Sequence, residues 1–200
     1  MRHLSLSALL AVTFSFTLTA FAVRVGAPAP DFTGTDTQGH TDKLSDFHGK
    51  YVVLEWTNNG CPYTQKHYES GNMQALQKEW TAKGVVWLTV LSSAPGEQGY
   101  MTAPAENSYM AREHADPTAA LLDPTGTIGR EYDAKTTPHM FVIDPSGKII
   151  YEGAIDDHPT TDLADVKISK NYVSAALAEA LANQPVAVSY TRPYGCSVKY

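Results

Sequence analysis

Two thiols are the groups in this sequence best suited to covalent chemistry, and they belong to its only cysteines, Cys61 and Cys196. Cys61 follows an apolar, β-branched run over residues 51–56 and precedes Pro62, a residue that suits the first position of a helix. A helix N-terminus carries about half a positive charge and unpaired amides, and both lower the pKa of a thiol placed there. Because the thiolate is the nucleophile, we expect Cys61 to be reactive and accessible, the alternative being an inert helix cap.

The second thiol lies in a C-terminal tail, residues 184–200, which has no helical or strand period. We expect this tail to be irregular and able to swing, with Tyr190 and Tyr194 holding it loosely on apolar surface near the site. Cys196 could then attack an oxidised Cys61 as a resolving cysteine. The alternative is a permanent disulfide that ties the tail to the body, for which chain entropy predicts about 5 kcal/mol of stabilisation.

The elements that would position Cys61 follow from the spacing of apolar residues. Continuous apolar runs over 51–56 and 85–91 predict central strands, and a helix over 62–83 would join them in a parallel crossover. The sequence further predicts a hairpin over 33–41, a helical turn over 44–50, helices over 103–114 and 172–182, a strand or helical turn over 126–132, and strands over 140–144 and 149–153. This order indicates one α/β domain with a central mixed sheet and helices on both faces.

The N-terminus has the pattern of a secretory signal peptide over residues 1–22. Arg2 precedes an apolar stretch, and small residues occupy positions 20 and 22. Cleavage after Ala22 would place a domain over 23–183 and the tail 184–200 in the periplasm or otherwise outside the cytoplasm. An uncleaved membrane anchor is the alternative, and no later stretch is long and apolar enough to span a membrane.

Charge and ligand spacing argue against several classes of partner. Without Arg2 the chain has 14 basic and 21 acidic residues and no basic run, so nucleic acid and anionic membranes are poor partners. Cys61, His67 and His139 are conceivable ligands for copper, but no paired ligand motif supports them, and His67 lies about 1.7 helical turns beyond Cys61. The sequence implies no metal and no cofactor.

Several ordered motifs resemble the redoxin superfamily, which includes the peroxiredoxin-like AhpC/TSA proteins and the periplasmic thioredoxin-like thiol oxidoreductases. They are residues 26–32 (Gly-Ala-Pro-Ala-Pro-Asp-Phe), residues 44–54, the pair Cys61-Pro62, and residues 137–144 followed by Gly147. The resemblance covers residues 25 to about 182 and implies a thioredoxin-like fold. It also implies that Pro138 is a cis proline facing Cys61, with the backbone of Thr137 open to an incoming chain.

Two departures from the family patterns bear on the reaction. Thioredoxins carry Cys-x-x-Cys, but Thr64 stands at the fourth position here, so exchange within that turn is impossible. Peroxiredoxins carry Pro-x-x-x-Thr/Ser-x-x-Cys, and this chain has Leu54 and Asn58 in place of the proline and the hydroxyl residue. Asn58 or Thr64 could substitute for that hydroxyl, but we expect only a modest reaction with peroxide.

Glu55 lies six residues before Cys61, where the resemblance implies a buried carboxylate. A buried carboxyl has a raised pKa and could relay protons to or from a leaving thiol. The alternative is a glutamate that faces solvent or pairs with a lysine. His139, next to Pro138, is expected either to lower the pKa of Cys61 as a cation or to be structural only.

The sequence thus predicts an exported thiol oxidoreductase in which Cys61 attacks a peroxide or a substrate disulfide and Cys196 resolves the intermediate. Glu55 would move protons, an external thiol would restore the enzyme, and the site would be shaped by Asn58, Thr64, Thr137 and Pro138. The alternative is a non-catalytic binding module of the same fold, with Cys61–Cys196 as a static disulfide.

Overall fold

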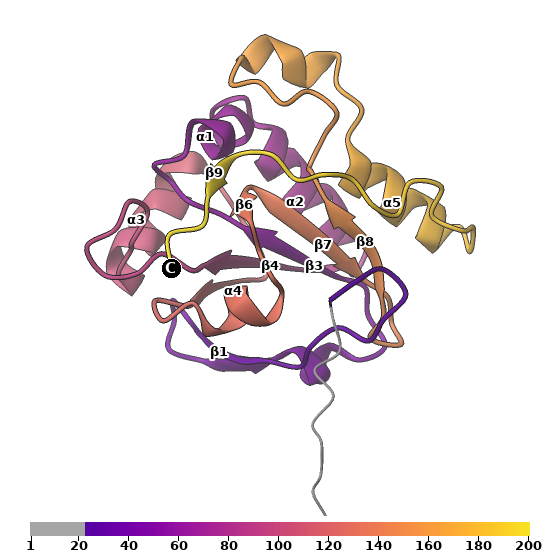
Figure 1. Cartoon of the computed structure of the whole chain (residues 1–200), viewed down its shortest axis with the longest axis horizontal. Coiled ribbons are helices and arrows are strands. Elements are labelled where there is room, and N and C mark those ends of the chain that lie inside the picture. Colours follow the sequence, from indigo (N-terminus) through magenta and orange to yellow (C-terminus); the bar gives the residue numbers. More distant parts are fainter. Residues whose placement is uncertain (1–22) are drawn as a thin grey trace, which may run out of the picture.

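A seven-stranded mixed sheet runs through the centre of the computed structural model, which describes residues 23–200 (Figure 1). The predicted signal peptide, residues 1–22, lies outside the described residues. The strands of this sheet, in spatial order, are β2 (Thr41–Lys43), β1 (Thr33–Asp36), β5 (Ala119–Leu122), β4 (Val86–Leu91), β3 (Val52–Trp56), β7 (His139–Ile143) and β8 (Ile149–Gly153). Strand β3 pairs in parallel with β4 and antiparallel with β7, so the predicted mixed sheet is confirmed.

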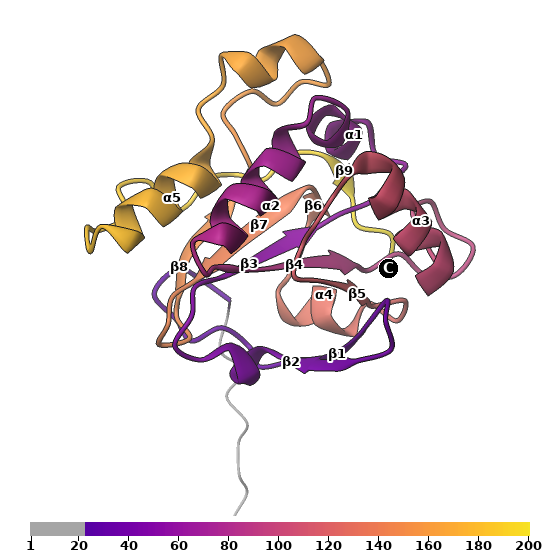
Figure 2. The ribbon, with the colours of Figure 1, turned by 180° about the vertical axis from the view of Figure 1, so that it is seen from behind.

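Helices cover both faces of the sheet, as the sequence predicted. They are η1 (Leu44–Phe47), α1 (Pro62–Glu69), α2 (Asn72–Ala82), α3 (Ala103–Glu113), α4 (Thr127–Glu131), η2 (Leu163–Lys167) and α5 (Tyr172–Leu181). Figure 2 shows α1, α2, α3 and α5 on one side, whereas α4 lies on the other side together with the N-terminal segment and the tail. Within the described residues, no helix combines the length and apolarity that crossing a bilayer requires.

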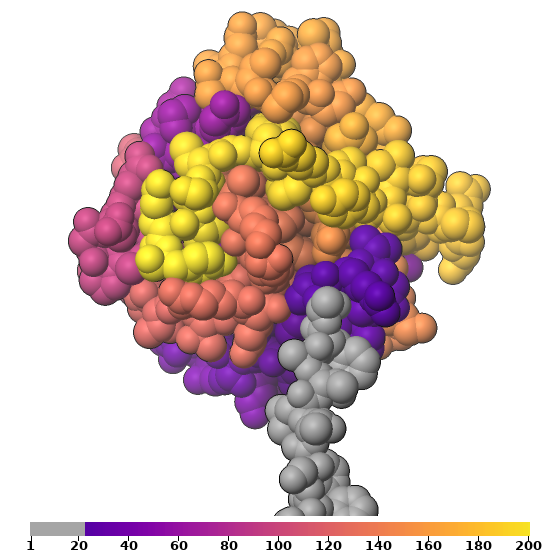
Figure 3. All heavy atoms as spheres, in the orientation of Figure 1, coloured from indigo at the N-terminus to yellow at the C-terminus, as the bar shows by residue number. Residues whose placement is uncertain are grey.

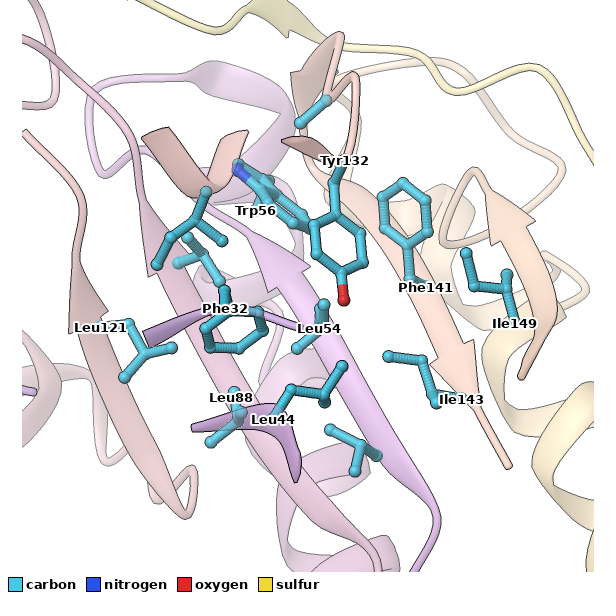
Figure 4. Close-up of a cluster of buried hydrophobic side chains, with 14 of the residues drawn as sticks. Phe32, Leu44, Leu54, Trp56, Leu88, Leu121, Tyr132, Phe141, Ile143 and Ile149 are labelled. Atoms are coloured by element: carbon cyan, nitrogen blue, oxygen red, sulfur yellow. The ribbon is translucent and has the colours of Figure 1, made fainter. Parts of the chain in front are cut away.

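The alternating side chains of β3 supply both hydrophobic cores. Leu54 and Trp56 face the α4 side, where Trp56 packs against Tyr132 and Phe141 at ring-centroid distances of 5.4 Å (Figure 4). Val53 faces the opposite core, beneath α1, α2 and α5. Because successive side chains of a strand point to opposite faces, Glu55 must enter the same core as Val53. All five residues of β3 are buried, which explains its continuous apolar pattern.

Three sequence predictions need correction. The helix expected over 62–83 is two helices, because Gly71 takes a left-handed conformation with φ 76° between them. Residues 119–122 form β5, which pairs in parallel with β4 and was not assigned from the sequence. The tail is not irregular throughout, since Cys196–Ser197 forms the short strand β9, paired antiparallel with β6 (Thr136–Thr137). A four-residue strand and a two-residue strand are too short to show a period.

Candidate active site

Cys61 caps the N-terminus of α1, with Pro62 at the first helical position. The sequence therefore placed this thiol correctly, but its predicted accessibility is wrong, because Cys61 is 0% exposed. The Cys61 Sγ donates a hydrogen bond to the Thr137 carbonyl oxygen at 3.0 Å. The backbone of Thr64, which lies in the first turn of α1, also forms a hydrogen bond with the Cys61 sulfur. The thiol thus lies between the helix start and the strand that precedes Pro138.

The tail closes over this site. Figure 3 shows it as a continuous band across one face of the protein, against the segment that carries β6. Cys196 pairs with Thr137 in the β6–β9 ladder. On either side the tail backbone is held by hydrogen bonds from Thr191 N to Glu152 O at 3.1 Å and from Ala94 N to Lys199 O at 2.7 Å. Docked in this way, the tail accounts for the burial of Cys61.

Gly195 allows the tail to approach the strand before Pro138 so closely. Its φ is +139°, a conformation that side-chain-bearing residues rarely adopt. A Cβ atom on this residue would lie 2.1 Å from the Thr137 carbonyl oxygen, the same oxygen that accepts the Cys61 hydrogen bond. The pairing of Cys196 with Thr137 therefore depends on glycine at position 195.

The two thiols are free and differ in their electrostatic surroundings. Burial alone raises the pKa of Cys61, but hydrogen bonds from Cys196 and from the Thr64 backbone outweigh it and leave the pKa below its ordinary value. Burial and the neighbouring Cys61 raise the pKa of Cys196 to about 11. Cys61 is consequently the thiol that ionises first, and Cys196 stays protonated beside it.

Glu55 is fully buried beneath α1 and α2, so it is neither solvent-facing nor paired with a lysine. Its carboxyl accepts hydrogen bonds from Tyr68 Oη at 2.8 Å, from Trp87 Nε1 at 2.8 Å and from Gln77 Nε2 at 3.4 Å. Burial raises the pKa of Glu55 to about 7, even though these hydrogen bonds oppose the change. A carboxyl with this pKa can both donate and accept a proton near neutral pH.

A second buried acid, Glu106 on α3, was missed from the sequence. Burial raises its pKa to about 7, and the charge of Glu55 adds to the effect. Its Oε2 atom has no hydrogen-bond partner. Helix α3 is amphipathic, and position 106 shares a face with Tyr109 and Met110, so the helical period could have indicated its burial.

Asn58 and Thr64 lie close to Cys61 in the chain but differ in their contacts. The Asn58 side chain is used within the loop, where it donates to Gln98 O at 3.0 Å and accepts from Gly60 N at 2.8 Å. The Thr64 side chain is buried and its hydroxyl has no hydrogen-bond partner. Two residues were expected as substitutes for the missing hydroxyl that would orient a peroxide. The Asn58 amide is already hydrogen-bonded within the loop, so only the Thr64 hydroxyl is free to take that role.

The bond between Thr137 and Pro138 is cis, as the resemblance implied. His139, the next residue, is buried, packs against Phe141 with the two rings tilted by 47°, and accepts a hydrogen bond from Lys135 N at 3.3 Å. Burial lowers the pKa of His139 to about 3, so the predicted alternative of a cationic histidine beside Cys61 is wrong. Residues 23–200 hold no group of three or more side chains placed to bind a metal ion.

A buried polar cluster beside the thiols was also missed from the sequence. It consists of Lys66 and His67 on α1, Asp156 after β8, and Tyr194 of the tail, and we call it the tail-anchor cluster. Lys66, His67 and Asp156 have ionisable side chains of a kind that local patterns assign to solvent. The four members of the cluster come from three separate segments of the chain. Tyr194 packs against the apolar core beneath α1, α2 and α5, as predicted, and its hydroxyl also enters the polar cluster. Tyr190 is 59% exposed, so its predicted docking on apolar surface is wrong.

The sequence model of the AhpC/TSA family matches residues 25–152 of this chain. The chain belongs to this family. Thiol-disulfide oxidoreductase ResA of Geobacillus kaustophilus is 29% identical over 128 residues, which cover 64% of this chain and 68% of the relative. Thioredoxin-like protein YneN of Bacillus subtilis is 28% identical over 127 residues, covering 64% and 69% of the two chains.

Solved structures agree with the family assignment. A thiol:disulfide interchange protein of the DsbE type from Chlorobium tepidum aligns with a TM-score of 0.54 and 27% identity over 66% of this chain and 85% of the other. An uncharacterized conserved protein from Geobacillus kaustophilus shares the fold, with a TM-score of 0.76 and 23% identity over 89% and 93%. The predicted redoxin superfamily, the thioredoxin-like fold and the general class of thiol-based oxidoreductase are thus confirmed.

Proposed function

We propose that this protein is an exported thiol-disulfide oxidoreductase with Cys61 as nucleophile and Cys196 as resolving cysteine. One observation carries the proposal: strand β9 holds Cys196 opposite Thr137, whose carbonyl oxygen lies 3.0 Å from the Cys61 sulfur. The relatives named thiol-disulfide oxidoreductase support the same reaction class. Export follows from the predicted signal peptide, and N-terminal sequencing of the mature protein, with residue 23 as the expected first residue, tests it.

The reaction proceeds in two exchange steps. The Cys61 thiolate attacks one sulfur of a substrate disulfide, forms a mixed disulfide and expels the other substrate sulfur as a thiolate. The Cys196 thiol then loses its proton and attacks the Cys61 sulfur, which forms the Cys61–Cys196 disulfide and releases the second substrate thiolate. The substrate gains two electrons and the protein loses two, so an external dithiol or two monothiols must reduce the protein for the next turnover.

The order of the two cysteines follows from their pKa values. A thiol with a lowered pKa supplies the thiolate for the first attack, and Cys61 is that thiol. Cys196, with a pKa of about 11, is a poor nucleophile until a base accepts its proton. The departing substrate thiolate is one such base, and Glu55, with a pKa of about 7, is the proposed reservoir for the proton.

A disulfide is better supported than a peroxide as the oxidant. The Asn58 amide at the peroxidase threonine position is held by Gln98 and Gly60 and has no hydroxyl to orient a peroxide. The Thr64 hydroxyl is the remaining candidate for that task. We therefore expect turnover with a disulfide substrate to exceed turnover with hydrogen peroxide at equal concentration, and the reverse order would assign the protein to the peroxidases.

Replacement of the tail cysteine tests the resolving role. C196S should keep the first attack, but a mixed disulfide at Cys61 should accumulate because the second step is blocked, and multiple turnover should fall at least about a hundredfold. The measurement is intact-protein mass spectrometry after one equivalent of a disulfide substrate, beside steady-state turnover. S197A, at the exposed neighbour in β9, is the matched control.

Two results would contradict the proposal. If C196S turns over at the wild-type rate, Cys196 has no part in the chemistry and resolution comes from another molecule. If the wild-type protein carries a Cys61–Cys196 bond that resists strong reductant and shows no turnover, the binding module with a static disulfide is the correct interpretation.

A further inference from the structure

The tail-anchor cluster connects the two cysteines through buried polar groups that the proposed exchange steps do not use. The Tyr194 hydroxyl donates a hydrogen bond to Asp156 Oδ1, which also accepts from His158 N at 3.0 Å. Asp156 Oδ2 lies 3.4 Å from Lys66 Nζ, and both side chains are almost completely buried. The carboxylate therefore joins α1 to the tail.

His67 completes the orientation of the Tyr194 hydroxyl. Its Nδ1 faces the Asn72 amide nitrogen at 2.9 Å and must accept there, so the ring proton of the neutral imidazole lies on Nε2. His67 Nε2 is 3.4 Å from the Tyr194 hydroxyl oxygen and donates toward it. Burial lowers the pKa of His67 to about 4, which agrees with a neutral ring. The Tyr194 hydroxyl is thus both donor and acceptor and has one orientation.

The place of Tyr194 in the chain makes this contact relevant to the chemistry. Tyr194 is two residues before Cys196, and Lys66 and His67 lie on the helix that Cys61 caps. The backbone hydrogen bonds that hold the tail elsewhere involve residues 189–191 and 198–199. Tyr194 also packs against Tyr63 of α1, with ring centroids 5.7 Å apart. Tyr194 is therefore the side chain that ties the part of the tail between residues 191 and 198 to α1.

We infer that Tyr194 is a positioning residue that, through Asp156, holds the Cys196 thiol beside Cys61. The inference rests on the proposed function, because it requires the two thiols to exchange with each other. Closing the tail raises the effective concentration of Cys196 at Cys61, and it also covers Cys61 against other reagents. Loss of the anchor should lower the effective concentration of Cys196 at Cys61, and it should also make Cys61 more accessible to other reagents.

The test is Y194F, which removes only the hydroxyl. Asp156 keeps the His158 N–H and Lys66 as partners, so the variant leaves no buried carboxylate unpaired. Y190F is the matched control, since Tyr190 is an exposed tyrosine of the same tail. Two quantities are measured: the equilibrium constant of the Cys61–Cys196 disulfide against glutathione, and the iodoacetamide alkylation rate of Cys61 in the C196S background.

We expect Y194F to lower the equilibrium constant about tenfold, equal to about 1.4 kcal/mol, and to raise the alkylation rate about tenfold. Y190F should change neither quantity more than about twofold. A change in only one quantity, or in neither, overturns the inference, because a displaced tail must alter both. If the wild-type protein forms no Cys61–Cys196 disulfide, the proposed function fails instead, and the alkylation rates still report whether Tyr194 anchors the tail.

Discussion

The raised pKa of Glu55 predicts a specific pH dependence of folding stability. The pKa changes from an ordinary value of 4.5 to about 7 because the folded protein buries the carboxyl. One pKa unit corresponds to about 1.4 kcal/mol, so the difference between folded and unfolded states amounts to about 3 kcal/mol. Below pH 4.5 the group is protonated in both states and contributes nothing. As the pH rises from 4.5 to 7, only the unfolded state ionises, which lowers the stability of the wild-type protein by about 3 kcal/mol.

E55Q removes the titration and keeps the shape of the side chain. The new amide oxygen can accept from Trp87 Nε1, and the amide nitrogen can donate to the Tyr68 hydroxyl, which serves as donor or acceptor. The variant should therefore fold. Its free energy of unfolding, relative to wild type, should rise by about 3 kcal/mol between pH 4.5 and 7.5 and stay level above that range.

Urea unfolding of the fully reduced proteins at several pH values measures this difference. E97Q, which removes an exposed carboxyl, corrects for the loss of one charge. The second buried acid, Glu106, is present in both proteins and cancels in the difference except for its coupling with Glu55. A difference that stays constant within about 1 kcal/mol over this pH range, or that changes with the opposite sign, would refute the reasoning.

Two further substitutions test the closed tail and the α4-side core. G195A places a Cβ 2.1 Å from the Thr137 carbonyl oxygen, so β9 should detach from β6. Iodoacetamide should then alkylate Cys61 at least about tenfold faster than in the control variant S197A. Equal alkylation rates would contradict the close packing of Gly195 against Thr137. S92A removes a buried hydroxyl that accepts from Trp56 Nε1 at 3.1 Å and donates to Asp123 Oδ2 at 2.6 Å. It should cost at least about 1–3 kcal/mol in urea unfolding, whereas S93A should cost less; equal losses would show that these two hydrogen bonds do not stabilise the protein.

Local patterns in the sequence determined the fold class and the place of the first cysteine. The apolar run of β3 and the helix start at Pro62 lie next to each other in the chain, so Cys61 could be placed at their junction without knowledge of distant contacts. Glu55 stood out because a glutamate within an apolar strand must face one of two covered sides. The structure confirms its burial and identifies the three side chains that donate to its carboxyl.

The position of the tail was decided by tertiary structure alone. Strand β9 has two residues and pairs with another two-residue strand about 60 positions earlier, and such short segments have no period to detect. The tail-anchor cluster gathers Lys66, His67, Asp156 and Tyr194 from three separate segments, and local patterns predict solvent exposure for buried charges of this kind. The burial of Cys61 follows from these long-range contacts. The sequence by itself therefore determined which thiol begins a helix, and only the folded chain decided that the other thiol covers it.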